Sequence, residues 1–130
     1  MKFPIIVLKE NEAPVYFFDN SNFGLVSKGG ESFYKNGVIY DSEGSSFLIS
    51  GIDSVNKATL LKSVIYFQQM YIAKVKFTPT GNLTISEVKE IILNHIQTFP
   101  KYWIQKDLID SLSASILNKS DFSELYRYIK

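Results

Sequence analysis

The clearest pattern of apolar and polar positions lies between residues 71 and 99. Apolar and lysine side chains alternate over residues 72–77, which predicts a strand with one buried and one solvated face. A turn is expected over residues 78–82, because Pro79 lacks the N–H that a sheet ladder needs. Apolar residues then recur at spacings of three and four up to Phe99, which is typical of an amphipathic helix.

This helix carries signals at both ends. Thr84 and Glu87 have the spacing of a capping box, and Leu83 and Val88 have that of a hydrophobic staple. Pro100 cannot continue a helix, so the helix is expected to end just before it.

The first part of the chain predicts short elements. Residues 5–8 are apolar without interruption, as in a strand covered on both faces. Together with residues 15–18 they predict an N-terminal hairpin. A short helix or turn is expected over residues 23–26, where Asp19-Asn20-Ser21-Asn22 supplies capping residues just before it.

A second hairpin is predicted around Asn36-Gly37, which suits a type I′ turn and separates residues 32–35 from residues 38–41. A further turn over residues 41–44 and a strand over residues 45–50 would extend this hairpin to a three-stranded meander.

Residues 52–70 fit two interpretations. A helix over residues 55–68 is favoured, but residues 63–67 also fit a buried strand. Towards the end of the chain, a helix is predicted over residues 104–116. Ser120 is expected to cap a last helix that runs to Ile129.

The order of these elements, strands first and helices last, predicts an α+β fold. We expect an antiparallel sheet, made of the N-terminal hairpin and the meander, with helices packed on one face and a helical C-terminal third. No linker, repeat or low-complexity segment divides the chain, which indicates a single domain over residues 1–130.

Composition narrows the function classes. The net charge of +1 argues against nucleic-acid binding through bulk charge. The absence of cysteine and the single histidine exclude thiolate and multi-histidine metal sites, and no cofactor is expected. The apolar run near the N-terminus is too short for a membrane span and lacks a signal-peptide cleavage site. These features predict a cytoplasmic protein that does not bind membranes.

Candidate chemistry is sparse. His95 lies on or beside the apolar face of its helix, and a partly buried structural role is the favoured interpretation. Asp41 and Glu43 flank a turn but lack the further oxygen ligands of a calcium loop. No phosphate-binding loop and no nucleophile elbow are present, so no catalytic residue is predicted.

Aromatic residues make up 15% of the chain and suggest a binding surface. Trp103, between two predicted helices, fits either a wedge at their junction, the favoured interpretation, or an exposed anchor. Two tyrosines of the predicted second hairpin are open to the same two interpretations. The candidate protein-binding residues are Tyr34, Tyr40, Asp41, Glu43, Tyr102 and Trp103.

The opening Pro4-Ile5-Ile6-Val7 and the run from Tyr34 to Gly44, followed by a strand and a capped helix, resemble small bacterial immunity-type proteins. Such proteins belong to polymorphic toxin systems, including contact-dependent growth inhibition. The resemblance covers about the first three-quarters of the chain and implies a protein that binds and neutralises a cognate toxin domain. Many nuclease inhibitors of this kind are strongly acidic, and the near-neutral charge here argues against a nuclease as the partner.

The leading hypothesis is therefore a non-enzymatic cytosolic protein that occludes a partner's surface. One alternative is a small-molecule-binding or enzymatic domain that uses His95 with a tyrosine and a carboxylate in a pocket. Closed, apolar surroundings of His95 would argue against an enzyme, and an open cleft with acidic residues would favour it. Another alternative is a structural subunit whose sheet edge pairs with itself in a homodimer.

Overall fold

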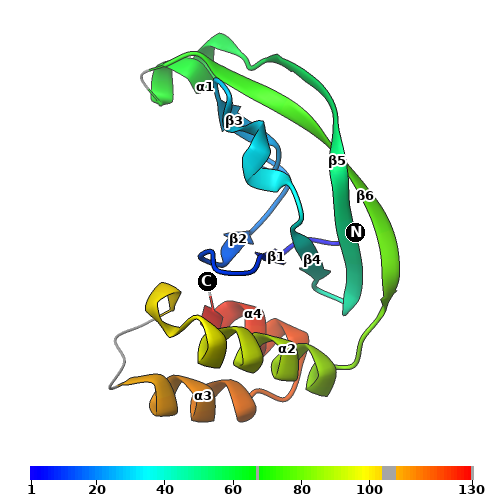
Figure 1. Cartoon of the computed structure of the whole chain (residues 1–130), viewed down its shortest axis with the longest axis vertical. Helices are drawn as coiled ribbons and strands as arrows, with labels where there is room; N and C mark the ends of the chain where they lie inside the picture. The colour runs from blue at the N-terminus through cyan, green and yellow to red at the C-terminus, as the bar shows by residue number, and fades with distance from the viewer. Residues whose placement is uncertain (67, 104–107, 130) are drawn as a thin grey trace.

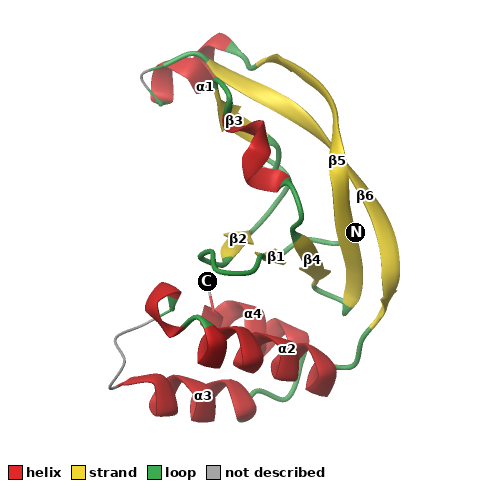
Figure 2. Ribbon diagram, in the orientation of Figure 1, coloured by secondary structure: helices red, strands yellow, loops and turns green. Residues whose placement is uncertain are grey.

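The computed structural model describes residues 1–66, 68–103 and 108–129. The chain is an α+β protein with an antiparallel sheet followed by helices, as the order of the predicted elements indicated. Figure 2 shows helices α2, α3 and α4 gathered at one end of the molecule. In chain order the elements are β1 (Ile5–Leu8), β2 (Val15–Phe17), β3 (Leu25–Ser27), η1 (Gly30–Tyr34), β4 (Val38–Asp41), β5 (Ser45–Lys57), α1 (Leu60–Ile65), β6 (Met70–Asn82), α2 (Ile85–Thr98), η2 (Pro100–Tyr102), α3 (Ile109–Leu117) and α4 (Phe122–Ile129).

The six strands form one curled sheet in the order β2-β1-β4-β5-β6-β3, and every neighbouring pair is antiparallel. β5 and β6 are 13 residues each and form a long ribbon that leads away from α2, α3 and α4 to α1 at its far end (Figure 1). The β5–β6 register shifts at three places. Such irregularities increase strand twist, which accounts for the curl of the ribbon.

β1 separates two apolar cores. Ile6 and Leu8 pack with α2, α3 and α4, whereas Ile5 and Val7 pack on the other face of the sheet, inside its curl. All four side chains are buried, so the prediction of a strand covered on both faces is confirmed. The predicted N-terminal hairpin is also confirmed, because β1 and β2 pair antiparallel.

The capping box of α2 is confirmed. The Glu87 N–H donates to Oγ1 of Thr84 over 3.2 Å, and the Thr84 N–H donates to Oε1 of Glu87 over 3.1 Å. The helix ends at Thr98, just before Phe99 and Pro100, as expected.

The turn predicted over residues 78–82 is wrong, because β6 continues to Asn82 and Pro79 lies opposite Phe47 of β5. One of the register shifts falls next to this pair, between Ser46 and Phe47. Proline is tolerated at edges and bulges, where its missing N–H breaks no ladder bond.

The hairpin predicted around Asn36-Gly37 is also wrong. Asn36 has the positive φ that such a turn favours, 64°, but the chain before it is the 3-10 helix η1. β4 pairs instead with β1 on one side and with β5 on the other. The β4–β5 turn over residues 41–44 is confirmed. Of residues 23–26, expected as a helix or turn, residues 23–24 form a turn and residues 25–26 belong to strand β3.

Much of the helix predicted over residues 55–68 is wrong, because β5 continues to Lys57 and, of the described residues in this range, only Leu60–Ile65 are α-helical. The predicted start of the next helix, residues 104–107, lies outside the described residues, and α3 covers Ile109–Leu117. The cap of α4 is Asp121, whose Oδ1 accepts from the Glu124 N–H over 2.8 Å. Ser120, the predicted cap, instead donates its own N–H to Glu124.

Candidate functional site

The two hairpin tyrosines of the predicted binding surface are buried. Tyr34 is 1% exposed and Tyr40 is 8% exposed, so of the two interpretations the buried one holds, and their place among the candidate protein-binding residues as exposed phenols is wrong. The Tyr34 hydroxyl accepts a hydrogen bond from the Gly24 N–H over 2.8 Å, and burial raises the pKa of this phenol. Tyr34 therefore belongs to the core inside the curled sheet.

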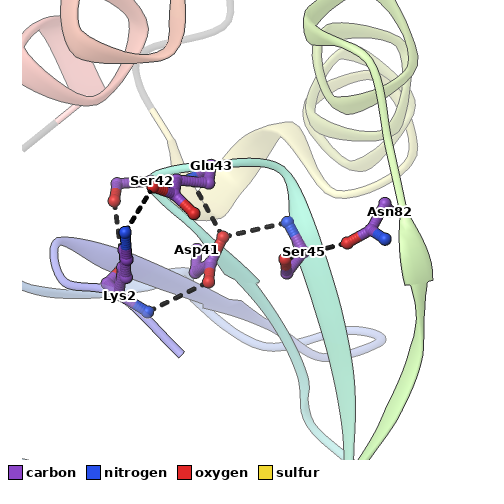
Figure 3. Close-up of polar contacts among 6 residues, drawn as sticks. All are labelled: Lys2, Asp41, Ser42, Glu43, Ser45 and Asn82. Atoms are coloured by element: carbon purple, nitrogen blue, oxygen red, sulfur yellow. Dashed lines mark hydrogen bonds and ion pairs between the residues drawn. The ribbon is translucent and has the colours of Figure 1, made fainter.

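Asp41 is a buried acceptor at the β4–β5 turn (Figure 3). Its Oδ1 accepts from the N–H groups of Glu43 and Ser45, both over 2.9 Å, and its Oδ2 accepts from the Lys2 N–H over 3.0 Å. Glu43 is exposed and forms an ion pair of 2.7 Å with Nζ of Lys2. These contacts fasten the N-terminal segment to the turn and leave Asp41 unavailable to a partner.

Tyr126 of α4 joins the helices to the same turn. Its hydroxyl lies 3.0 Å from the carbonyl oxygens of both Tyr40 and Asp41 and donates to them. Burial, followed by the nearby Asp41 charge, raises the pKa of the Tyr126 phenol. A neutral phenol is the form that can donate, so burial and the hydrogen bonds favour the same protonation state.

Both ring nitrogens of His95 are occupied. Its Nε2 lies 2.8 Å from the Lys9 carbonyl oxygen, and its Nδ1 accepts from the Trp103 indole N–H over 2.8 Å. Because a carbonyl can only accept, Nε2 must carry the hydrogen and the ring is the neutral Nε2–H tautomer. His95 thus has no lone pair free to act as a base.

Trp103 fits the interpretation of a wedge. It is half-buried, packs against the helical core and lies between the end of α2 and the start of α3. Tyr102 is also half-buried, and its hydroxyl donates to Oδ1 of Asn11 over 3.4 Å. The structure therefore brings Asp41 together with Glu43, and Tyr102 with Trp103, but the six predicted residues do not form one surface.

An open depression of about 750 Å³ lies between α2 and the β1–β4 pair. One wall comes from Leu8, Val38 and Tyr40, of which Leu8 and Val38 are opposite each other in the strand register. The other wall includes Ile91, Asn94 and His95, and the last two lie on the same side of α2 as Ile91 because they follow it by three and four residues.

The rim of this depression carries two lysines and two glutamates, so its charges cancel. Lys9 forms an ion pair of 2.9 Å with Glu12, and its Nζ also donates to the Phe33 carbonyl. Glu10 and Lys35 are the other two charged lining residues. The cleft around His95 is therefore open and contains acids, but its imidazole has no free nitrogen.

An exposed apolar surface, which the sequence patterns did not predict, lies on α1 at the far end of the ribbon (Figure 1). Leu61, Val64 and Ile65 are 71%, 60% and 60% exposed, and their spacing puts them on one face of the helix. Ser63 is buried instead, and its hydroxyl accepts from the Met70 N–H over 3.0 Å. α1 thus turns Leu61, Val64 and Ile65 outward and Ser63 inward.

Among the described residues, no three or more histidine and acidic side chains cluster closely enough to hold a metal ion. In the same parts of the chain, no helix has both the length and the apolar character that a bilayer span requires. The chain matches no family model, no curated protein and no solved structure.

Proposed function

We propose that this protein is a non-enzymatic binding protein that neutralises a cognate toxin domain by covering part of its surface with α1 and the end of the β5–β6 ribbon. The observation that carries this proposal is the outward aliphatic face of α1. The sequence resemblance to immunity-type proteins supports the same class of partner. Neutralisation would take place in the cytoplasm, in keeping with a chain that contains no cysteine.

The α1 face favours a protein partner for an energetic reason. Burying a Leu, Val or Ile side chain contributes about 1.5–3 kcal/mol, and here three such side chains lie adjacent and more than half exposed. Exposed single apolar residues are common, whereas a contiguous set on one helical face marks an interaction site. A partner that covers Leu61, Val64 and Ile65 would gain most of this free energy.

The surroundings of His95 support a function without catalysis. The residue sits beside an open cleft with Glu10 and Glu12, where a base would be useful. Its Nδ1 is hydrogen-bonded to Trp103 and its Nε2 to the Lys9 carbonyl, so a proton transfer would first have to break one of these bonds.

Co-expression with the product of the adjacent gene tests the proposal. We expect a stable complex, measured by affinity capture and size-exclusion chromatography, and restored growth of cells that produce the toxin. Leu61→Ser and Ile65→Ser should each weaken the complex about tenfold, since each removes about 1.4 kcal/mol or more of apolar burial.

Leu117→Ser is the matched control, because Leu117 is 59% exposed but lies at the end of α3. It should leave the affinity unchanged. The absence of a complex would refute the proposed function. A complex that tolerates both α1 substitutions as well as Leu117→Ser would show that α1 does not carry the binding. Light scattering on the protein alone would reveal whether a second copy covers α1 instead.

A further inference from the structure

The depression between α2 and the β1–β4 pair has features that the proposed protein-binding surface does not use. Its volume of about 750 Å³ falls within the range of small-molecule sites. Its apolar lining comes from elements of different kinds: Leu8 and Val38 from two paired strands, and Ile91 from α2. His95 fixes the α2 wall to β1 through its bond to the Lys9 carbonyl. The walls are therefore held in place without a ligand.

Tyr40 is a lining residue whose polar group has no partner. The side chain is more than nine-tenths buried, yet its hydroxyl makes no hydrogen bond to any described residue. The polar contacts of Tyr40 are made by its backbone, which lies between β1 and β5 in the sheet and whose carbonyl accepts from the Tyr126 hydroxyl. Burial raises the pKa of the Tyr40 phenol, so the group is a neutral donor at physiological pH. The hydroxyl oxygen itself is not fully enclosed, so it keeps contact with solvent in the depression, and a ligand acceptor would take the place of water at this donor.

Further polar groups converge on the same opening. Asn36, which precedes β4, and Asn94, on α2, are lining residues, and neither side chain is hydrogen-bonded within the described chain. Carboxamides both donate and accept, so they suit an uncharged polar ligand group. The two lysines and two glutamates at the rim cancel, which gives no net attraction for an anion or a cation.

We propose that this depression binds an uncharged organic ligand that has an apolar body and a carbonyl acceptor, with Tyr40 donating its hydroxyl to that carbonyl. Leu8, Val38 and Ile91 cover the apolar body, and Asn94 pairs with an amide of the ligand. A free carboxamide and the peptide group of an apolar segment share this chemistry. The inference does not depend on the proposed toxin partner, because it concerns a different face of the molecule.

Benzamide is the probe for the test, because it combines an apolar ring with an uncharged carboxamide. Titration followed by ¹H–¹⁵N NMR should give saturable shifts of the Asn36 and Asn94 side-chain amides, with a Kd on the order of 1 mM for a fragment of this size. Tyr40→Phe should weaken binding about five- to tenfold, which corresponds to one neutral hydrogen bond. This variant should fold normally, since the Tyr40 hydroxyl bonds nothing in the protein.

Three controls make the result decisive. Tyr128→Phe changes an exposed phenol on α4 and should leave benzamide binding unchanged. Asn94→Phe fills the depression from an exposed helical position and should abolish binding. N-acetyl-leucine N-methylamide, which has peptide groups but no free carboxamide, should compete with benzamide if peptide groups are bound, and fail to compete if only free carboxamides fit.

The inference is overturned if benzamide gives no saturable shifts, or if the shifts map away from the depression. If Tyr40→Phe bound benzamide as tightly as the wild type, the hydroxyl would have no role in binding. If benzoate bound as tightly as benzamide, the ligand would not have to be uncharged. Complex formation with a protein partner would be unaffected by any of these outcomes, so the two proposals stand or fall separately.

Discussion

Trp103 donates its indole N–H to Nδ1 of His95 over 2.8 Å, and the two rings meet edge to face with centroids 5.6 Å apart. The same imidazole donates from Nε2 to the Lys9 carbonyl just after β1. One histidine thus joins the segment after α2 to the first strand of the sheet. The link holds the helical layer against the sheet beside the depression, which Lys9 and His95 both line.

Trp103→Phe should lower the free energy of unfolding by about 2 kcal/mol. About 1 kcal/mol is the lost hydrogen bond, which leaves Nδ1 of His95 without a donor, and the rest is lost apolar area. Urea unfolding followed by circular dichroism measures the change without needing the tryptophan signal. Tyr102→Phe is the control: its hydroxyl makes one exposed contact of 3.4 Å, so the loss should stay within about 0.5 kcal/mol. Equal losses for the two variants would contradict a structural role of the indole–imidazole bond.

Tyr126→Phe should destabilise the protein by about 1–2 kcal/mol at neutral pH. The hydroxyl is buried and donates to the carbonyls of Tyr40 and Asp41, and removing it leaves both without this donor. Tyr128→Phe on the same helix is the matched control, because Tyr128 is exposed and its variant should unfold at the same urea concentration as the wild type. A Tyr126→Phe variant as stable as Tyr128→Phe would show that α4 is held by apolar contacts alone.

The same tyrosine should make stability depend on pH above about 10. Its pKa is raised in the folded state, mainly by burial, so folding favours the neutral phenol. This contribution is fully present below the unfolded-state pKa of about 10 and is lost as the pH rises towards the higher folded-state pKa, at up to about 1.4 kcal/mol per pH unit. Urea unfolding at several alkaline pH values should show a steeper loss for the wild type than for Tyr126→Phe. Parallel pH profiles of the two proteins would contradict a contribution from Tyr126. Neither profile should be flat, because the pKa values of Tyr34 and Tyr40 are also raised in both proteins.

What the amino-acid pattern predicted well was local. The capping box depends on Thr84 and Glu87, three residues apart, so nothing distant has to be known. Asn36 likewise takes the positive φ expected of it. The predicted hairpin partner of β4 was the segment just before Asn36. In the structure that side of β4 pairs with β1, about 30 residues earlier in the chain, while β5 lies on its other side. Pairing over such a separation depends on the whole sheet, and the turn residues contain no information about it.

The candidate site was harder to predict because side-chain type does not determine burial. Tyr34 and Tyr40 flank a polar turn in the sequence, but Tyr34 is buried in the core inside the curled sheet and Tyr40 in the core that the helices cover. Leu61, Val64 and Ile65 have the spacing of a core-facing helix, and the structure turns them outward. Ser63 faces inward from α1 because its hydroxyl accepts a hydrogen bond from the Met70 N–H at the start of β6. Periodicity identifies an apolar face but not what covers it.

The β4–β5 turn offers a prediction that separates backbone conformation from crowding. Gly44 has φ +85° and Gly29 has φ +77°, so alanine at either position costs about 1–2 kcal/mol of backbone strain. A Cβ at Gly29 would meet nothing within 4 Å, whereas a Cβ at Gly44 would overlap the Leu83 carbonyl oxygen and lie 2.7 Å from Cζ of Phe122. The Gly44 carbonyl also accepts from the Leu83 N–H over 2.8 Å, so this contact fastens the turn to the start of α2.

Gly29→Ala should therefore cost about 1–2 kcal/mol, and Gly44→Ala more than about 3 kcal/mol, because the latter must also move a backbone carbonyl and an aromatic ring. Urea unfolding of the two variants side by side measures the difference. Both substitutions add one methyl group at a positive φ, so an equal loss would mean that the turn relaxes freely away from α2 and α4. A larger loss for Gly44→Ala would establish that the turn, α2 and α4 are packed as one unit around the buried carboxylate of Asp41.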